Sequence, residues 1–326
     1  MAEQDVVAWN EAEVAELVAK TAALKASMGR VIIGQEEVVE LLITCLLAGG
    51  HALVEGVPGL GKTLLVKSLA QATDMQFRRV QFTPDLMPSD IVGTEILEED
   101  QITRQRSFRF QPGPVFTQVL LADEINRATP KTQSGLLEAM EERQVSADGV
   151  TRPLPEPFFV IATQNPASQV GTFPLPESQL DRFLMCLSLG YPDPSAERAL
   201  LMGEDRRAML RTLQAAMTPA ELMDAQASLR RIHASPSLID YVQALAQASR
   251  QGTLFAEGLS PRATLALLQA ARAWAALEGR DHVLPEDIQA VLAPVCAHRL
   301  RPLKSAQGMA LASRDLVLQL QKSVPV

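Results

Sequence analysis

Apolar residues recur at helical spacing near the start of the chain. Val14, Leu17, Val18 and Leu24 repeat among acidic and alanine positions, and a second apolar set runs over 38–46. This spacing places the apolar side chains on one face of a helix. The pattern therefore predicts one helix in the first segment and a second helix that begins at about residue 35.

Four short apolar runs further along have the length and composition of buried strands. Helical stretches, among them QSGLLEAMEERQ, lie between these runs. Short buried strands that alternate with helices are typical of a parallel sheet covered on both faces. The sequence therefore predicts an α/β fold, with strands at 52–55, 79–82, 119–122 and 158–162.

The pattern changes after the YPDP segment at 191–194. Strand signals end there, and alanine- and leucine-rich amphipathic stretches follow. We place a domain boundary at this segment because its prolines interrupt regular structure. We expect a core domain over 1–190 and a smaller, all-helical domain over 191–326, with helices at about 195–213, 219–232, 236–250, 261–278 and 285–297 and one more from about 305.

The composition is that of a protein with a sizeable core and an acidic charge balance. The 326 residues are 47% hydrophobic and 21% charged, and the formal net charge is −8. This charge opposes nonspecific attraction to phosphate backbones, so a nucleic-acid partner is disfavoured. No signal peptide or bilayer-length apolar run is visible, and the three cysteines and four histidines show no disulfide or metal-ligand spacing. We expect a cytoplasmic protein without membrane insertion, disulfides or a structural metal.

One glycine-rich segment has the pattern of a phosphate-binding loop. Residues 56–63 read GVPGLGKT and lie between an apolar strand and an amphipathic helix. Glycines let backbone N–H groups turn toward phosphates, and the helix presents its positive amino end to the same anion. Lys62 can neutralise phosphate oxygens, and the Thr63 hydroxyl can ligate Mg²⁺. A plain strand–turn–helix corner is the alternative, but the context favours binding of ATP or ADP by Gly56, Pro58, Gly59, Leu60, Gly61, Lys62, Thr63 and Leu64.

Two carboxylates end the third apolar run. Asp123 and Glu124 follow VLLA directly. At the carboxyl end of a strand in an open α/β sheet, Asp123 can hold Mg²⁺ and Glu124 can act as general base toward water. Two acids that cap a following helix would look the same. The phosphate-binding loop upstream shifts the balance toward hydrolysis.

Three further polar residues have weaker signals. Asn165 ends the fourth strand and can position water or contact the γ-phosphate, although Asn-Pro turns are common in any loop. Arg182 follows a short helix, and Arg262 lies in the first turn of a helix, where a cation opposes the helix dipole. Surface ion pairing is the ordinary role of isolated arginines. The sequence leaves both roles open for each of these residues.

Five strings taken together resemble the MoxR family of AAA+ ATPases. They are GVPGLGKT, LLADEINRA, VIATQNP, LPESQLDRF and GLSPRA, in that order, and the resemblance runs over about 31–300. It implies an AAA+ P-loop αβα core with a parallel sheet, followed by a smaller all-α lid. It also implies ATP hydrolysis with Mg²⁺ in a homo-oligomeric ring, expected to be a hexamer.

The resemblance also assigns roles to single residues. Residues 56–63 match Walker A, and Asp123 with Glu124 matches Walker B. Asn165 matches sensor 1, Arg262 matches sensor 2 and would contact the γ-phosphate from the lid, and Arg182 matches an arginine finger that reaches the neighbouring subunit. The loop Val31, Ile32, Ile33 and Gly34 matches the segment around adenine, and Gln81 matches a polar residue that restrains Glu124.

Two insertions fit the same family. Residues 84–114 resemble a helix-2 insert, whose centre looks like a hairpin that turns at Glu99-Asp100 with Ile102, Phe108 and Phe110 on its return. Residues 144–157 resemble a pre-sensor-1 hairpin around Asp148-Gly149, a strong turn signal. Both would lie near the ring pore, and two plain surface hairpins are the alternative.

Relatives of this kind act as chaperone-like remodellers. The resemblance implies that ATP hydrolysis drives maturation of a client protein, such as cofactor or metal insertion, together with a von Willebrand factor A domain partner. The chain shows no adaptor of its own. A nucleic-acid motor or loader is one alternative, which the acidic charge opposes, and a nucleotide-gated scaffold with negligible turnover is another.

Overall fold

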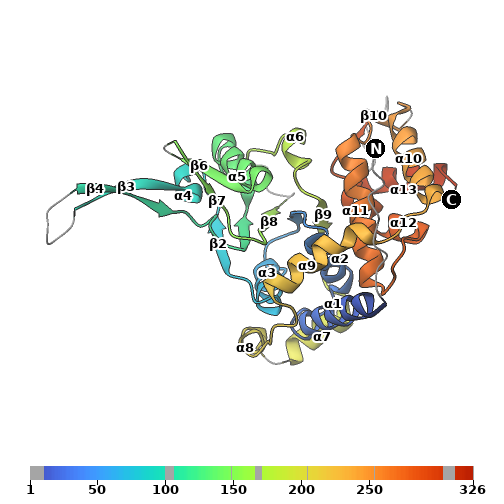
Figure 1. The fold of residues 1–326 in the computed structure, drawn as a ribbon, viewed down its shortest axis with the longest axis horizontal. Helices are drawn as coiled ribbons and strands as arrows, with labels where there is room; N and C mark the ends of the chain where they lie inside the picture. Colours follow the sequence, from blue (N-terminus) through green and yellow to red (C-terminus); the bar gives the residue numbers. More distant parts are fainter. Residues whose placement is uncertain are drawn as a thin grey trace.

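A five-stranded parallel sheet forms the centre of the molecule (Figure 1). The computed structural model describes residues 11–99, 106–147, 149–165, 171–203, 205–252, 254–303 and 313–325. The strand order is β2-β5-β8-β1-β9, and every neighbouring pair is parallel. The strands are β1 Ala52–Glu55, β2 Phe77–Gln81, β5 Val119–Asp123, β8 Phe159–Gln164 and β9 Met185–Ser188.

The predicted α/β class and the four predicted strands are confirmed, and the fifth strand was missed. β9 has only four residues, and it pairs with β1 at the edge of the sheet. Met185 and Leu187 are buried, whereas Cys186 is half-buried and Ser188 is exposed. A strand of four residues contains only two buried positions. Alternation over so short a run is a weak sequence signal.

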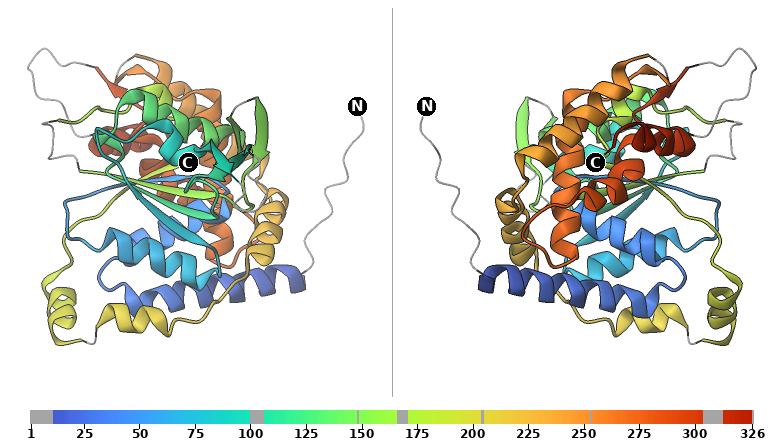
Figure 2. Two further views of the ribbon diagram at one scale, coloured as in Figure 1. Left: turned by 90° about the vertical axis from the view of Figure 1, so that its left-hand side faces the viewer. Right: turned by 90° about the vertical axis from the view of Figure 1, so that its right-hand side faces the viewer.

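Helices cover both faces of the sheet because the strand side chains alternate. Ala52, Val54, Leu121 and Ile161 pack on one side, with helices α1 to α3. In the views of Figure 2 these blue helices lie below the sheet, and α5 lies above it. The bounds are α1 Glu11–Val31, α2 Glu36–Leu47, α3 Lys62–Ala72, α4 Pro88–Val92, the 3₁₀ turn η1 Ile125–Arg127, α5 Pro130–Glu142 and α6 Glu177–Leu180.

Hairpins occupy both predicted insertions. β3 Gly93–Glu99 pairs antiparallel with β4 Arg106–Pro112, and this hairpin projects far from the rest of the molecule (Figure 1). β6 Gln144–Ala147 pairs antiparallel with β7 Val150–Pro153. The expected turn residues Asp100 and Asp148, and the expected return-strand residue Ile102, lie outside the described residues, as does the peptide that follows Asn165.

The segment after the YPDP turn packs under the core. It contains α7 Pro194–Met202, α8 Arg206–Arg211, α9 Pro219–Ser228 and the 3₁₀ turn η2 Leu229–Arg231. Ala216 N–H donates to Ala72 O at 2.7 Å, and Gln226 Nε2 donates to Leu46 O at 2.7 Å. The helix expected at 195–213 is two helices, because Gly203 caps α7 in an extended conformation.

The helical lid follows this segment. It consists of α10 Pro236–Arg250, α11 Pro261–Leu277, α12 Pro285–Cys296 and α13 Ser313–Ser323. Most alanines of α11 are buried, which lets α12 and the core helix α2 approach it closely. A small strand pair, β10 Phe255–Glu257 with β11 Arg301–Pro302, adds to the predicted helices. Within the described ranges, no helix is long and apolar enough to cross a membrane.

Candidate functional site

The glycine-rich loop joins β1 to α3 in a shape that can hold an anion. Gly59 and Gly61 have φ angles of +90° and +82°, which only glycine adopts readily. α3 begins at Lys62, without a side-chain hydrogen bond to its amino end and without an acidic residue in its first turn. The free amino end of this helix, with its positive dipole, therefore faces the loop and fits a phosphate group.

Lys62 places a cation at the mouth of this loop. Its Nζ donates to the carbonyl oxygens of Gly56 and, at 3.4 Å, of Gln164. Burial lowers the pKa of Lys62, and the nearby charges of Asp123 and Glu124 oppose that shift. A phosphate oxygen can replace these carbonyl acceptors.

Asp123 ends β5 beside the loop and is held from two sides. Thr163 Oγ1 donates to one carboxylate oxygen at 2.6 Å. Arg79 donates to the other oxygen from Nη2 at 2.6 Å and from Nε at 3.1 Å. The parallel register of β2, β5 and β8 brings these three side chains together at the carboxyl edge of the sheet. An oxygen donor at this position suits Mg²⁺.

Glu124 is fixed at an unusual backbone angle next to Asp123. Its φ is +56°, in the left-handed region that non-glycine residues rarely adopt. Its backbone N–H donates to Thr163 Oγ1 at 2.9 Å, and its carboxylate accepts from Gln81 Nε2 and from Arg127 Nη1, both at 2.9 Å. Strained backbone of this kind is common where a side chain must be aimed. The contact with Gln81 is the one that the sequence resemblance implied.

Three residues of this network were not found from the sequence: Arg79, Thr163 and Arg127. Each contacts Asp123 or Glu124. Arg79 lies two residues before Gln81 and therefore on the same face of β2. That spacing was the only signal, since the sequence does not say which strands are neighbours.

Asn165 follows β8 directly, at the same edge of the sheet. The preceding residue, Gln164, pairs with Glu55 in the β1–β8 register, and its Nε2 donates to the Glu55 carboxylate. Glu55 in turn immediately precedes the glycine-rich loop. The structure therefore brings Asn165 to the edge that carries the loop and the two carboxylates.

The loop 31–34 lies against the segment that follows β9. Val31 and Ile32 are buried, and Gly34 has a φ of +71°. A Cβ on Gly34 would lie 2.5 Å from Ala196 Cβ and 3.2 Å from Pro192 Cβ. Gln35 Nε2 donates to Gly190 O at 2.8 Å, which ties the two segments together. The loop is thus packed directly against the segment after β9.

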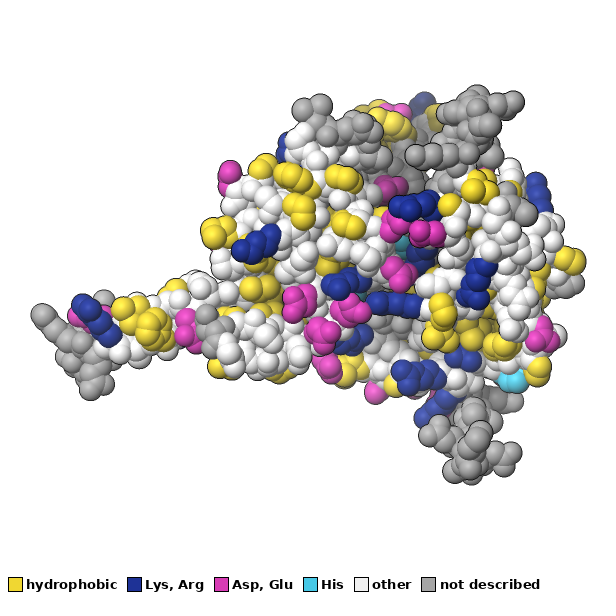
Figure 3. Space-filling model, turned by 90° about the horizontal axis from the view of Figure 1, so that it is seen from above, with side chains coloured by type: hydrophobic (Ala, Val, Ile, Leu, Met, Phe, Trp, Pro, Cys, Tyr) yellow, Lys and Arg dark blue, Asp and Glu magenta, His cyan; other side chains and the backbone are white. Residues whose placement is uncertain are grey.

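The two arginines lie together at the opposite edge of the sheet. Arg182 Nη2 is 2.9 Å from one oxygen of Glu141, and Arg262 Nη1 is 3.0 Å from the other. Glu141 follows Met140, whose carbonyl contacts His51 at the amino end of β1. Figure 3, seen from the side of α6 and the start of α11, shows acidic and basic side chains interleaved between core and lid. The resemblance implied that Arg262 contacts a γ-phosphate from the lid and named no chain. At this edge Arg262 lies away from the glycine-rich loop of its own chain.

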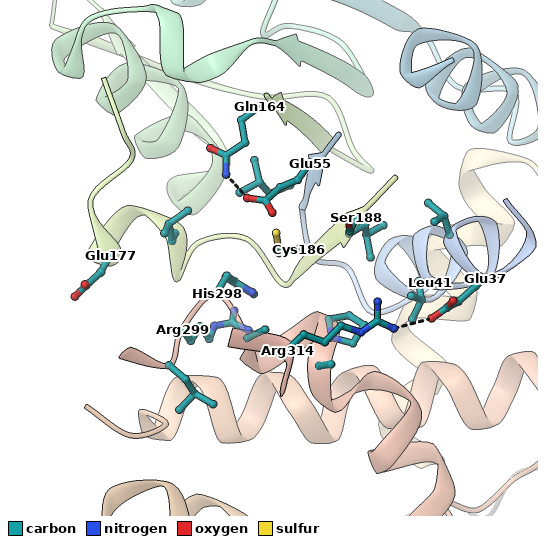
Figure 4. A pocket seen from close by; sticks show the side chains of 18 of the residues that line it. Glu37, Leu41, Glu55, Gln164, Glu177, Cys186, Ser188, His298, Arg299 and Arg314 are labelled. Atoms are coloured by element: carbon teal, nitrogen blue, oxygen red, sulfur yellow. Dashed lines mark hydrogen bonds and ion pairs between the residues drawn. The ribbon is translucent and has the colours of Figure 1, made fainter. Parts of the chain in front are cut away.

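A cavity of about 600 Å³ separates the sheet edge from the lid (Figure 4). Glu55 and Gln164 point into it from the sheet, and His298 and Arg299 from the lid. Burial lowers the pKa of His298 to about 3 and raises the pKa of the Cys186 thiol. Among the residues that line the cavity, only Glu55 and Gln164 adjoin the glycine-rich loop. The cavity therefore lies at the interface between core and lid and is not the phosphate site.

Comparisons with known proteins agree with this geometry. The family model "ATPase family associated with various cellular activities (AAA)" matches residues 51–185, and an AAA lid domain model matches residues 247–318. A solved structure of a candidate ATPase from Cytophaga hutchinsonii superimposes with a TM-score of 0.86 at 36% identity, covering 97% of each chain. The second model and the first together span the loop, the carboxylates and most of the lid.

Two curated relatives carry informative names. Chaperone MoxR1 of Mycobacterium tuberculosis is 43% identical over 282 residues, which make up 83% of this chain and 73% of that protein. Protein MoxR of Paracoccus denitrificans is 35% identical over 300 residues, 85% of this chain and 87% of that protein. The similarity thus extends over core and lid alike.

Proposed function

The chain belongs to the MoxR family of AAA+ ATPases, and from this premise we propose that it hydrolyses ATP at a site that a second copy completes. The observation that carries the proposal is the position of Arg182 and Arg262. Both lie at the amino edge of the sheet, whereas the loop and the carboxylates of the same chain lie at the carboxyl edge. Each chain thus carries the loop and the carboxylates at one edge of the sheet and the two arginines at the other, and a neighbouring chain would complete the site.

The carboxyl edge supplies the groups that bind and activate. The N–H groups of the glycine-rich loop and Lys62 would hold the phosphates, and the loop 31–34 would hold the adenine. Thr63 and Asp123 would hold Mg²⁺, which when bound neutralises phosphate charge. Glu124 would take a proton from the attacking water, and Asn165 would orient that water.

The amino edge supplies positive charge to the neighbouring chain. Charge spreads over the γ-phosphate oxygens in the transition state, and a guanidinium that reaches them in trans accelerates the reaction. A contact between two different edges is heterologous, and repeated heterologous contacts form a ring when the rotation between neighbours closes. We propose a hexameric ring in which Arg182 and the lid residue Arg262 both act on the neighbour.

The ring would act on other proteins as a chaperone-like remodeller in the cytoplasm. The relative named as a chaperone supports this role. The projecting β3–β4 hairpin exposes Leu97 and Phe108, which are cross-strand partners, and it would offer them to a client near the pore. A von Willebrand factor A domain protein would recruit that client for maturation or metal insertion.

Complementation between two inactive variants tests the shared site. Glu124→Gln removes the base but leaves both arginines, and Arg182→Ala removes the finger but leaves the base. We expect each variant alone to lose at least about a hundredfold in ATPase rate. An equimolar mixture should recover activity, because the arginines of the first can serve the base of the second. A mixture as inactive as its components, although it assembles, would contradict the proposal.

A further inference from the structure

One carboxylate joins two arginines that come from different domains. Glu141 near the end of α5 contacts Arg182 of the core at 2.9 Å through Oε2 and Arg262 of the lid at 3.0 Å through Oε1. Its side chain is 35% exposed, so the pairs are shielded from water only in part. Each carboxylate oxygen therefore holds one guanidinium.

The backbone on either side of Arg182 is fixed by a third arginine, which comes from the lid. Arg299 is almost fully buried, and its guanidinium donates to the carbonyl oxygens of Asp181, Phe183 and Leu184 at 2.7 to 3.2 Å. It also pairs with the Asp181 carboxylate at 2.7 Å. The second oxygen of Asp181 lies 4.0 Å from Arg262 Nε. Two lid arginines therefore hold the segment around Arg182: Arg299 contacts its backbone carbonyls, and both Arg299 and Arg262 lie near the Asp181 carboxylate.

Two cations this close need a shared anion to stay together. Without Glu141, the guanidinium groups of Arg182 and Arg262 would repel each other, because like charges at this separation are unfavourable. With it, each guanidinium uses one N–H on the carboxylate, and the planar fork leaves further N–H groups free for phosphate oxygens. The carboxylate can therefore orient both groups without occupying them.

We propose that Glu141 is a positioning residue that holds Arg182 and Arg262 as one unit directed at the nucleotide of the neighbouring chain. This inference rests on the shared-site function proposed above. Because one arginine belongs to the core and the other to the lid, the unit forms only while the lid is docked as the structure shows it. Hydrolysis in one chain is thereby coupled to the lid position of the next.

A donor and acceptor mixture isolates this role. The donor carries Glu124→Gln and keeps its arginines. The acceptor carries Arg182→Ala and Arg262→Ala and keeps its base. All measured turnover then occurs at acceptor sites that donor arginines complete. Glu141→Gln is placed first in the donor and then in the acceptor, and each mixture is assayed for kcat, for KM of ATP and for assembly.

In the donor, Glu141→Gln should lower kcat by about 10- to 100-fold, the cost of a small misplacement of a catalytic group, and leave KM unchanged. In the acceptor, it should have no effect, because the arginines it would hold are already gone. Glu142→Gln in the donor is the matched control, since Glu142 is exposed on the same helix and has no ion pair among the described residues. It should leave the rate unchanged.

Three results would overturn the inference while the shared site stands. An equal loss from both placements would mean that Glu141 only stabilises the fold, and no loss from the donor would mean that it orients nothing. A rise in kcat would mean that it restrains the arginines instead. If the parent mixture without Glu141→Gln is already inactive although it assembles, the shared site itself fails, and this inference falls with it.

Discussion

At the scale of single residues, the carboxylate expected to bind Mg²⁺ already has a positively charged partner. Arg79 contacts Asp123 with two N–H groups, and the Arg79 side chain is 46% exposed. The cation competes with a metal ion for the same oxygen. Thr163 holds the other oxygen and would not compete by charge.

Arg79→Gln should therefore lower the Mg²⁺ concentration that gives half-maximal ATPase activity. An exposed ion pair is worth up to about 1 kcal/mol, which corresponds to a shift of up to about fivefold. A titration of activity with MgCl₂ at constant ATP measures it. Arg78→Gln is the control, because Arg78 points to the other face of β2 and should not alter the midpoint. An unchanged midpoint for Arg79→Gln would show that the Arg79–Asp123 ion pair does not compete with the metal.

His51 makes the stability of the core depend on pH. Val160 N–H donates to Nδ1 at 3.0 Å, and Nε2 contacts Met140 O at 3.3 Å, so the neutral ring fits its partners and a protonated ring does not. Burial lowers the pKa of His51 from 6.5 to about 4. Between these values the unfolded chain binds the proton and the folded chain does not, so stability falls as pH falls.

Unfolding in urea at pH 7 and pH 5 tests this effect. At pH 5 the protonation of the unfolded state should cost about 2 kcal/mol at this one residue. His51→Gln should therefore lose about 2 kcal/mol less than the wild type between the two pH values. His282→Gln, at a half-exposed lid position, should lose as much as the wild type. Equal losses for all three proteins would contradict the assignment.

At the scale of elements, the conformation of the loop 31–34, which is proposed to hold the adenine, depends on one glycine. Gly34 turns the chain between α1 and α2 with a positive φ and packs against Pro192 and Ala196. A side chain there must strain the backbone and displace Ala196 of α7 and Pro192 just before it. The loop 31–34 would change its conformation as a result.

Gly34→Ala should weaken binding of a fluorescent ATP analogue about tenfold, because strain of this kind costs about 1 to 3 kcal/mol. Gly29→Ala is the matched control. Gly29 lies within α1 with no atom in the way of a Cβ, so alanine should keep affinity and stabilise the helix by about 0.5 to 1 kcal/mol. Affinity equal to the wild type in Gly34→Ala would mean that the base binds elsewhere.

Elements with strong local signals could be predicted from the sequence, but which elements lie next to one another could not. The loop at 56–63 and α3 follow from glycines and helical periodicity alone. β9 was missed because a strand of four residues at the edge of a sheet has little periodic pattern. Arg79 and Thr163 were missed because their role depends on which strands pair. Pairing order is a property of the whole sheet and has no local signature.

At the scale of the whole molecule, the lid position decides where Arg262 can act. The sequence resemblance implied a contact with the γ-phosphate, but it could not say on which chain. Residues 194–228 run beneath the core helices, and the lid then packs at the edge that carries Arg182. The path of a connecting segment depends on tertiary contacts such as that of Gln226 with Leu46, which no periodicity reveals.

The central claim is that one chain alone cannot complete the reaction. ATPase rate per chain, measured over a dilution series alongside sedimentation, tests it most directly. We predict that the specific rate falls on dilution in step with loss of the assembly, and that Arg182→Ala remains inactive at concentrations where it is assembled. A specific rate that stays constant down to the monomer, with full activity in assembled Arg182→Ala, would contradict the account.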